Sequence, residues 1–162
     1  MSGGAGRSMV VTELDRKSRK WSEIIDEIVR IEKKVFPEHE SLSRSLDDEL
    51  KKNNSGLLYV EIEAEIVGYL MYSSPSSLST LITELAVKEK FRRQGHGEAL
   101  LKAAIEKIRS KRTRRISLHV DPLKISAMHL YKKLGFQIDT LVKSYYSLDR
   151  DAYRMYIDFD EE

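Results

Sequence analysis

The stretch that decides the fold is "FRRQGHGEALL", residues 91–101. Gly95 and Gly97 stand one residue apart in it, just behind Arg92 and Arg93 and directly ahead of an apolar pattern at helical spacing. A helix N-terminus leaves backbone N–H groups unpaired and carries about half a positive charge, so a glycine-rich turn that opens a helix favours an anion. The turn therefore predicts a site for a phosphate group.

Two common phosphate-binding motifs do not fit this turn. The P-loop requires Gly followed by Lys and Ser or Thr, which the stretch lacks. The dinucleotide fingerprint requires a third glycine where Leu100 stands. Taken alone, the two glycines are also compatible with a plain loop end beside two solvated arginines, so the rest of the chain has to decide between these interpretations.

The composition is that of an ordinary globular protein. Of the 162 residues, 41% are apolar and 33% are charged. The net charge of +2 argues against a generally nucleic-acid-binding surface, although residues 88–115 carry eleven Lys or Arg against three Glu. The absence of cysteine excludes disulfides, thiolate metal ligands and a cysteine nucleophile.

Targeting signals are not visible in the sequence. No apolar run approaches the roughly 18 residues of a membrane span, and residues 1–9 lack the apolar centre of a signal peptide. We therefore expect residues 1–9 to form a flexible tail, and the protein to act in the cytoplasm or also in the nucleus, without a membrane partner.

Apolar spacing and turn residues predict the order of the elements. We expect a helix over 21–36 that Pro37 ends, a short helix within 41–52 with serine caps, a hairpin with strands at 58–63 and 66–72, a strand at 81–87, a helix behind the glycine turn, a strand at 116–120, a helix capped by Asp121 that stops at Gly135, and closing strands at 136–142 and 151–159. Tyr145 and Tyr146 fall in the loop between the closing strands. The order predicts one α/β domain over residues 10–162, a central mixed sheet flanked by about four helices.

Three motifs occur in the order and spacing of one known family. Residues 92–97 match its signature, which is Gln or Arg, two residues, Gly, one residue, and Gly or Ala. The "LAV" at residues 85–87 and the "AMHLYKKLGF" at residues 127–136 match two further motifs. The chain resembles the GNAT superfamily of acetyl-CoA-dependent N-acetyltransferases over roughly residues 57–159, and the resemblance implies the fold of that family.

The resemblance also implies how acetyl-CoA, the acetyl donor, is held. The strand before the turn would pair with the pantetheine arm through backbone groups of Leu85, Ala86 and Val87. The turn would hold the pyrophosphate with Arg92, Arg93, Gln94, Gly95, His96, Gly97 and Glu98. The family usually carries Asn seven residues before its tyrosine, whereas this chain has Lys124, which would reach a phosphate or solvent instead.

Acyl transfer to an amine needs a neutral amine, a polarised thioester carbonyl and a proton for the leaving thiolate. The resemblance implies that Tyr131, in the "LY" position, supplies this proton and contacts the cofactor, and a phenol of pKa around 10 suits that role. His119 stands where several N-terminal acetyltransferases place the residue that accepts the amine's proton, and histidine is mostly neutral at pH 7. Glu84 is the competing base, although strand alternation puts it on the face opposite Thr83 and Leu85 unless a bulge re-aims it.

The closing segment "KSYYSLDRDAYRMYIDF", residues 143–159, resembles N-terminal acetyltransferases of the ribosomal-protein alanine type and their eukaryotic relatives. The resemblance implies that Tyr145 and Tyr146 cover the substrate backbone and that Phe36 and Pro37 form the opposite wall. The expected substrate is thus the N-terminal α-amine of a protein or peptide, with or without an auxiliary subunit. An α-amine with a pKa near 8 is already roughly a tenth neutral at pH 7, whereas a lysine is neutral to well under about 0.1%.

Other functions share parts of this pattern. An acetyltransferase for lysine or for small amines such as polyamines and aminoglycosides would carry the same cofactor motifs, and a non-catalytic CoA-binding module would be favoured only by Lys124. A nucleic-acid-binding function would rest on "KIRSKRTRR", residues 107–115, without an aromatic stacking platform. His39, His96 and His129 show no ligand spacing and no carboxylate cluster accompanies them, so we expect no metal.

Overall fold

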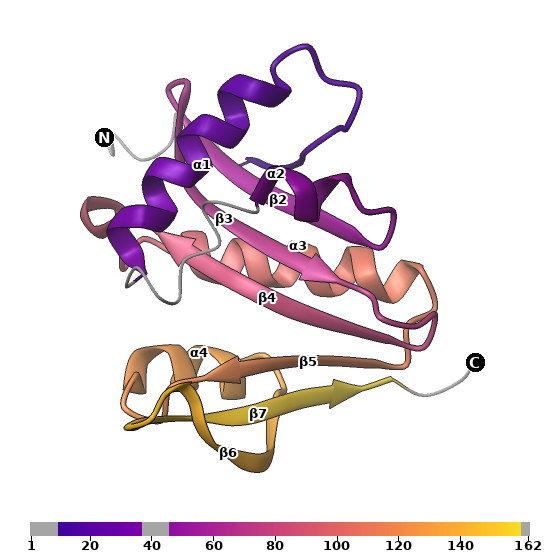
Figure 1. Ribbon diagram of the computed structural model, residues 1–162, viewed down its shortest axis with the longest axis vertical. Coiled ribbons are helices and arrows are strands. Elements are labelled where there is room, and N and C mark those ends of the chain that lie inside the picture. Colours follow the sequence, from indigo (N-terminus) through magenta and orange to yellow (C-terminus); the bar gives the residue numbers. More distant parts are fainter. Residues whose placement is uncertain (1–9, 37–45, 160–162) are drawn as a thin grey trace, which may run out of the picture. The chain divides into compact units, whose positions relative to one another are not determined.

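The computed structural model describes residues 10–36 and 46–159 (Figure 1). The chain divides into two compact units, unit 1 with residues 1–71 and 84–104 and unit 2 with residues 72–83 and 105–162. The strands follow the order β1-β2-β3-β4-β5-β7-β6 in a seven-stranded sheet. β4 and β5 pair in parallel, whereas β1 with β2, β5 with β7 and β6 with β7 pair antiparallel. The predicted mixed sheet with helices is confirmed.

Unit 1 contains the N-terminal elements and the glycine turn. Its elements are β1 (Val10–Glu13), α1 (Trp21–Val35), α2 (Leu46–Lys51), β2 (Ser55–Ile62), most of β3 (Glu65–Ser73), the end of β4 (Ser79–Val87), the short 3-10 helix η2 (Glu89–Phe91) and the first part of α3 (His96–Ser110). The hairpin and both helices agree with the prediction, while the serine caps predicted before α2 lie outside the described residues. β1 was missed because it is short and largely exposed, which leaves no alternation to detect.

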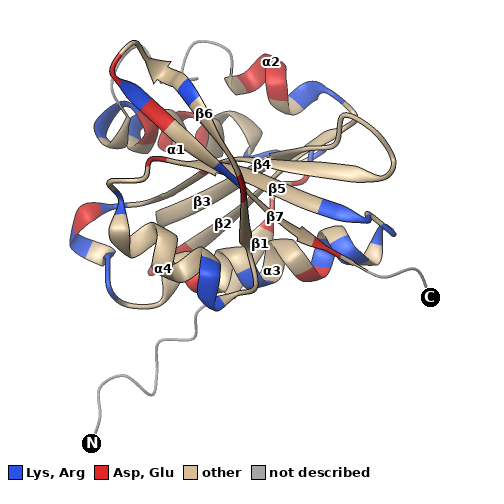
Figure 2. Ribbon diagram, turned by 90° about the horizontal axis from the view of Figure 1, so that it is seen from below, with Lys and Arg blue, Asp and Glu red and all other residues tan. Residues whose placement is uncertain are grey.

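The core of unit 1 forms where α1 and α2 cover one face of β2 and β3 (Figure 1). α1 is strongly amphipathic, and its isoleucines Ile24, Ile25, Ile28 and Ile31 are buried. Burying such a side chain contributes about 1.5–3 kcal/mol. α2 adds Leu46 and Leu50 to the same core, while its outer positions carry the acidic residues seen in Figure 2.

Gly68 of β3 lies very close to residues of β4 and α3. A Cβ atom at this position would lie 3.0 Å from the carbonyl oxygen of Ala86, 3.2 Å from Cγ2 of Val87 and 3.4 Å from Cδ1 of Leu100. A residue with a Cβ atom would require the Ala86 carbonyl to move by a few tenths of an ångström. β3 can therefore pass tightly against the end of β4 and against α3, the two segments that flank the glycine turn.

Unit 2 contains the start of β4, the end of α3, β5 (Arg115–Val120), α4 (Ile125–Lys133), β6 (Gln137–Ser147) and β7 (Arg150–Asp158). Its buried apolar residues include Ile116 and Leu118 of β5, Met128 of α4 and Met155 of β7. β5 pairs along its whole length with β7, from Arg115 opposite Asp158 to Val120 opposite Tyr153. This pairing holds the residues near the end of β5 in a fixed register.

The start of α4 differs from the prediction. The carboxylate of Asp121 accepts a hydrogen bond from the Leu123 N–H at 2.9 Å, and its carbonyl accepts one from the Lys124 N–H at 3.0 Å. These bonds close a turn before the helix, so Lys124 is the N-cap residue and the predicted cap at Asp121 is wrong. The predicted stop at Gly135 is confirmed, since it follows α4 with a φ of 104°.

Among the residues that the structure describes, no helix is both long and apolar enough to cross a membrane.

Candidate active site

The glycine turn in unit 1 has the backbone of an anion site. Arg93 and Gly95 have φ angles of 62° and 86°, both in the left-handed region, and α3 begins at the next residue, His96. The Ala99 N–H donates to the Gly95 carbonyl at 3.0 Å, so the hydrogen-bond ladder of α3 starts directly at the turn and the first N–H groups of the helix face it. Left-handed residues beside a helix start gather such N–H groups into a concave site for an anion.

Side chains of the turn fold it back toward β4. Nε of Arg92 donates to the Val87 carbonyl at 3.1 Å, and Nε2 of Gln94 donates to the Lys90 carbonyl at 3.3 Å. The Glu98 carboxylate lies 3.6 Å from the Lys102 ammonium along α3. Among the predicted cofactor residues, Arg92 and Gln94 thus fix the shape of the turn.

His96 differs from its neighbours because its ring is buried. The side chain is 4% exposed, neither ring nitrogen has a hydrogen-bond partner among the described residues, and the ring meets Phe91 edge-on at 6.3 Å. Burial lowers the pKa of His96, which keeps the imidazole neutral. The backbone amide of His96, not its ring, is therefore the group suited to an anion.

Glu84 lies in the core of unit 1. It is 8% exposed and its carboxylate accepts a hydrogen bond of 2.9 Å from the Tyr69 hydroxyl. Burial and the fully buried Glu32 of α1 raise the pKa of Glu84 to about 8. Such a carboxyl holds its proton at neutral pH, and a protonated carboxyl cannot accept one from an amine. Of the strand residues that follow, Ala86 is buried, while Leu85 and Val87 are half-buried.

His119 and the two tyrosines of β6 lie in contact in unit 2. The His119 ring stacks on the Tyr145 ring with centroids 4.2 Å apart and an interplanar angle of 10°. The Tyr146 ring meets Tyr145 edge-on at 4.8 Å. The structure therefore brings together three residues that the sequence predicts for catalysis and substrate binding. Their predicted loop position is wrong, because β6 extends to Ser147 with an irregular register near its end.

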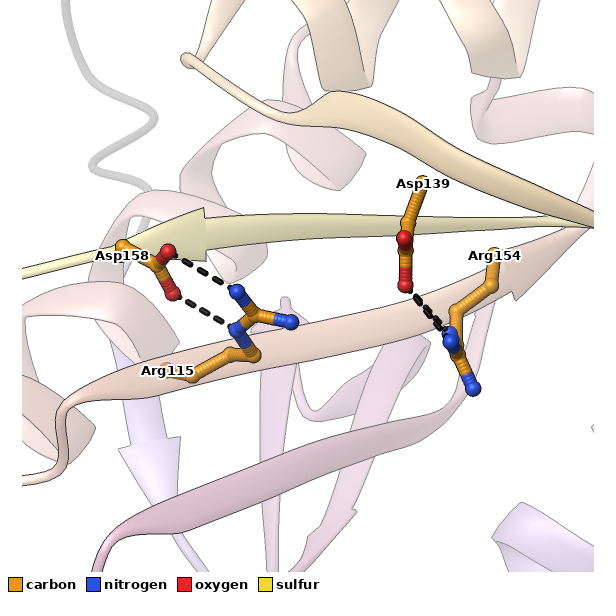
Figure 3. A network of polar contacts seen from close by, with 4 residues as sticks. All are labelled: Arg115, Asp139, Arg154 and Asp158. Atoms are coloured by element: carbon orange, nitrogen blue, oxygen red, sulfur yellow. Dashed lines mark hydrogen bonds and ion pairs between the residues drawn. The ribbon is translucent and has the colours of Figure 1, made fainter.

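The charges around His119 favour its neutral form. Burial is the main cause that lowers the pKa of His119, and the positive charge of Arg154 adds to it. Arg154 stands directly opposite His119 in the β5–β7 ladder. Two hydrogen bonds, of 2.9 and 2.6 Å, tie the Arg154 guanidinium to the Asp139 carboxylate (Figure 3). A neutral imidazole is the form that a general base requires.

Tyr131 is held inside unit 2 by α4. It is 9% exposed, and its ring meets Phe136 edge-on at 6.0 Å. Burial raises the pKa of Tyr131 to about 12, so the phenol keeps its proton over the whole physiological range. Lys124 precedes α4 with an exposed side chain. A protonated phenol and an exposed ammonium both suit the roles that the sequence predicts for them.

The predicted substrate wall in unit 1 is only partly described. Phe36 is half-buried against the core and follows α1 with an extended backbone, φ −108° and ψ 142°. Pro37 lies outside the described residues. Within residues 10–36 and 46–159, no cluster of three or more His, Asp or Glu side chains is arranged to hold a metal ion.

The basic stretch 107–115 is largely engaged within unit 2. Arg109 lies 5.2 Å from the Phe159 ring centroid, and the Lys111 ammonium lies 5.4 Å from the Tyr72 ring centroid. Arg115 forms a bidentate ion pair with Asp158, with distances of 2.7 and 2.9 Å (Figure 3). These basic side chains thus interact with aromatic and acidic residues of their own unit. This weakens the alternative of a nucleic-acid-binding function.

The sequence did not predict an ion pair beside the tyrosines. This pair is formed by Asp121 and Arg150. Arg150 Nη2 lies 3.0 Å from Asp121 Oδ2, and the guanidinium lies 4.8 Å from the Tyr146 ring centroid. The two residues are far apart in the chain, and no periodic pattern connects them. Only the register of β7 beside β5 brings them together.

Comparison with known proteins assigns the class. The model of the acetyltransferase (GNAT) family matches residues 21–136. An N-alpha-acetyltransferase of Sulfurisphaera tokodaii is 31% identical over 143 residues, which cover 81% of this chain and 85% of the relative. Ard1 from Thermoplasma volcanium is 25% identical, with a TM-score of 0.78 over 94% of this chain and 99% of that one. The ribosomal-protein-S18-alanine N-acetyltransferase from Escherichia coli, 19% identical, shares the fold with a TM-score of 0.81 over 96% of both chains.

The family match and the shared fold define the class as an acyltransferase. The chain belongs to the GNAT family of acetyltransferases.

Proposed function

We propose that this enzyme transfers the acetyl group of acetyl-CoA directly to the N-terminal α-amine of a protein or peptide. The observation that carries the proposal is the contact of His119 with Tyr145 and, through it, with Tyr146. It joins a neutral imidazole, suited to accept a proton, to two rings suited to cover an extended peptide. The name of the Sulfurisphaera protein, an N-alpha-acetyltransferase, points to the same class of amine.

The glycine turn is the proposed site for the pyrophosphate of acetyl-CoA. Left-handed backbone at Arg93 and Gly95 and the positive end of the α3 dipole, at His96, fit a doubly charged group. The close packing at Gly68 holds the end of β4 in place, where Leu85, Ala86 and Val87 would pair with the pantetheine arm. Acetyl-CoA supplies the activated acetyl group as a thioester.

The chemistry requires two proton transfers. The amine nitrogen attacks the thioester carbonyl, a C–N bond forms and the C–S bond breaks. His119 accepts the proton that the amine loses, because its lowered pKa keeps it neutral at neutral pH. Tyr131 donates a proton to the leaving thiolate, and both side chains then exchange protons with solvent. Glu84 has no place in this scheme, because it holds its own proton in the core.

The test is release of free CoA from acetyl-CoA by the purified chain with a panel of amines. We expect release with a short peptide that has a free N-terminus and blocked lysines. We expect none with the same peptide when its N-terminus is blocked and its lysines are free. Turnover of the second peptide would establish lysine acetylation instead, and turnover of polyamines or aminoglycosides alone would establish a small-molecule enzyme.

A further inference from the structure

A chain of side-chain contacts joins the end of β5 to the β6–β7 hairpin. Asp121, just after β5, forms the ion pair with Arg150 at 3.0 Å, and the Arg150 guanidinium lies over the Tyr146 ring at 4.8 Å. Tyr146 meets Tyr145, and Tyr145 stacks on His119, two residues before Asp121. The contacts therefore begin and end on the same segment, residues 119–121.

Backbone pairing leaves the two tyrosines poorly fixed. The β6–β7 ladder has one register shift between Ile138 and Thr140, pairs Val142 with Ala152, and resumes only at Ser147 opposite Arg150 after a second shift. Ser144, inside this interval, has a φ of 55°, and its N–H donates to the Asp151 side chain at 2.8 Å. Where the ladder is irregular, side-chain contacts decide where the rings lie.

The carboxylate of Asp121 is held in place at the end of β5. Asp121 is 8% exposed, and its other carboxylate oxygen accepts the Leu123 N–H. Burial alone would raise the pKa of Asp121, but the Leu123 N–H and the Arg150 guanidinium outweigh it, so the net pKa lies below its usual value. The carboxylate is thus charged and already oriented, and Arg150 loses little freedom by binding to it.

We propose that Arg150 is a positioning residue that holds Tyr146 and Tyr145 as the substrate wall and, through Tyr145, fixes the ring of the base His119. This role rests on the proposed function, in which the two tyrosines cover the peptide. Arg150 suits it because a planar guanidinium pairs with a carboxylate and stacks on a ring at once. Its loss is expected to weaken peptide binding while leaving acetyl-CoA binding intact.

The chain offers a matched control at the opposite end of the same strand pair. Arg115 forms its ion pair with Asp158 (Figure 3) and lies over the Tyr156 ring at 4.3 Å. It therefore makes the same two kinds of contact as Arg150, but at the start of β5, whereas His119 lies near its end. Arg115→Met removes an arginine from β5–β7 without touching the tyrosine pair.

The first readout needs no substrate. In the wild type, stacking on Tyr145 shifts the ring-proton NMR signals of His119 upfield, and a His119→Asn variant assigns them. Arg150→Met is expected to move these signals toward unstacked values, whereas Arg115→Met leaves them in place. Arg150→Lys keeps the charge but loses the flat ring contact, so an intermediate shift is expected. Unchanged His119 signals in both Arg150 variants would overturn the positioning role.

The second readout is steady-state kinetics with a peptide that has a free N-terminus. Arg150→Met should raise KM for the peptide at least ~10-fold while KM for acetyl-CoA stays within about twofold, and Arg150→Lys should recover part of the loss. Wild-type peptide KM in Arg150→Met would contradict the proposal. If Arg150→Met does not fold, the comparison of Arg150→Lys with Arg115→Lys decides it. A wild-type enzyme without peptide turnover refutes the proposed function, while the His119 signals still decide the positioning role.

Discussion

The imidazole of His119 lies nearly parallel to the phenol ring of Tyr145, 4.2 Å away. Tyr145 comes from the irregular end of β6 and His119 from the regular strand β5. The candidate base is thus packed directly against the candidate substrate wall. A change that displaces one of these rings is expected to affect the other.

The pH dependence of catalysis should report the environment of His119. Because burial and Arg154 lower its pKa from 6.5, kcat/KM, once corrected for the fraction of peptide whose α-amine is neutral, should be constant near neutral pH and fall only as the pH drops below that value. Arg154→Gln removes the opposing positive charge and leaves Asp139 without its partner, and both changes raise the pKa of His119. The acidic limb of the pH–rate profile should therefore move to higher pH.

Arg154→Lys, which keeps the charge, and Arg115→Gln, which is remote along β5, serve as controls and should keep the wild-type profile. An unmoved acidic limb in Arg154→Gln would mean that His119 is not the titrating base.

Tyr131→Phe removes the proposed proton donor with little change in shape. Since burial keeps the phenol protonated, its loss should lower kcat at least ~10-fold, within the usual range for acid–base groups. Binding of acetyl-CoA, measured by calorimetry, should stay close to that of the wild type. Wild-type kcat in this variant would remove Tyr131 from the mechanism.

Glu84 should influence stability, not catalysis. Its folded pKa of about 8 lies above its ordinary value of 4.5, so the folded state keeps a proton that the unfolded state has lost. The free energy of unfolding should therefore fall as the pH rises from about 4.5 to about 8. Glu84→Gln removes this titration and should flatten the dependence, measured by urea unfolding at several pH values.

Glu106→Gln, an exposed change on α3, should retain the wild-type slope. Equal slopes in wild type and Glu84→Gln would show that the buried carboxyl is already ionised in the folded protein, which would reopen its candidacy as a base.

Gly95→Ala tests the anion site of the turn. Alanine in the left-handed region costs about 1–2 kcal/mol, and a distorted turn no longer presents its amides together. The affinity for acetyl-CoA should fall about tenfold or more. Gly135→Ala, at a second positive φ after α4, is the matched control and should lose stability while keeping its affinity. Equal affinities in the two variants would remove the turn from the binding site.

The sequence predicts those parts of the molecule in which neighbouring residues act together. The isoleucines of α1 recur at helical spacing, and Gly95 opens a helix directly behind a strand. The start of α4 was predicted too early, because Asp121 uses its carboxylate for a turn at Leu123 and for the distant Arg150. Such a pair depends on strand register, which local sequence does not encode.

The candidate site likewise contains some residues that local motifs predict and others whose environment arises only in the folded chain. Tyr131, His119 and the tyrosine pair were predicted from motifs, and the structure places them in unit 2, where His119 contacts Tyr145. The raised pKa of Glu84 was not predictable, because it follows from burial and from Glu32, which meets Glu84 only in the folded core. The tyrosines were placed in a loop because a strand with an irregular register carries no alternating pattern.

The central claim concerns which amine receives the acetyl group. One peptide that carries both a free N-terminus and an unblocked lysine can be incubated with the enzyme and acetyl-CoA, and the modified atom located by fragmentation in a mass spectrometer. We expect the acetyl group on the α-amine alone. Acetylation of the lysine side chain would contradict the account, as would an unmodified peptide under conditions in which a small amine is acetylated.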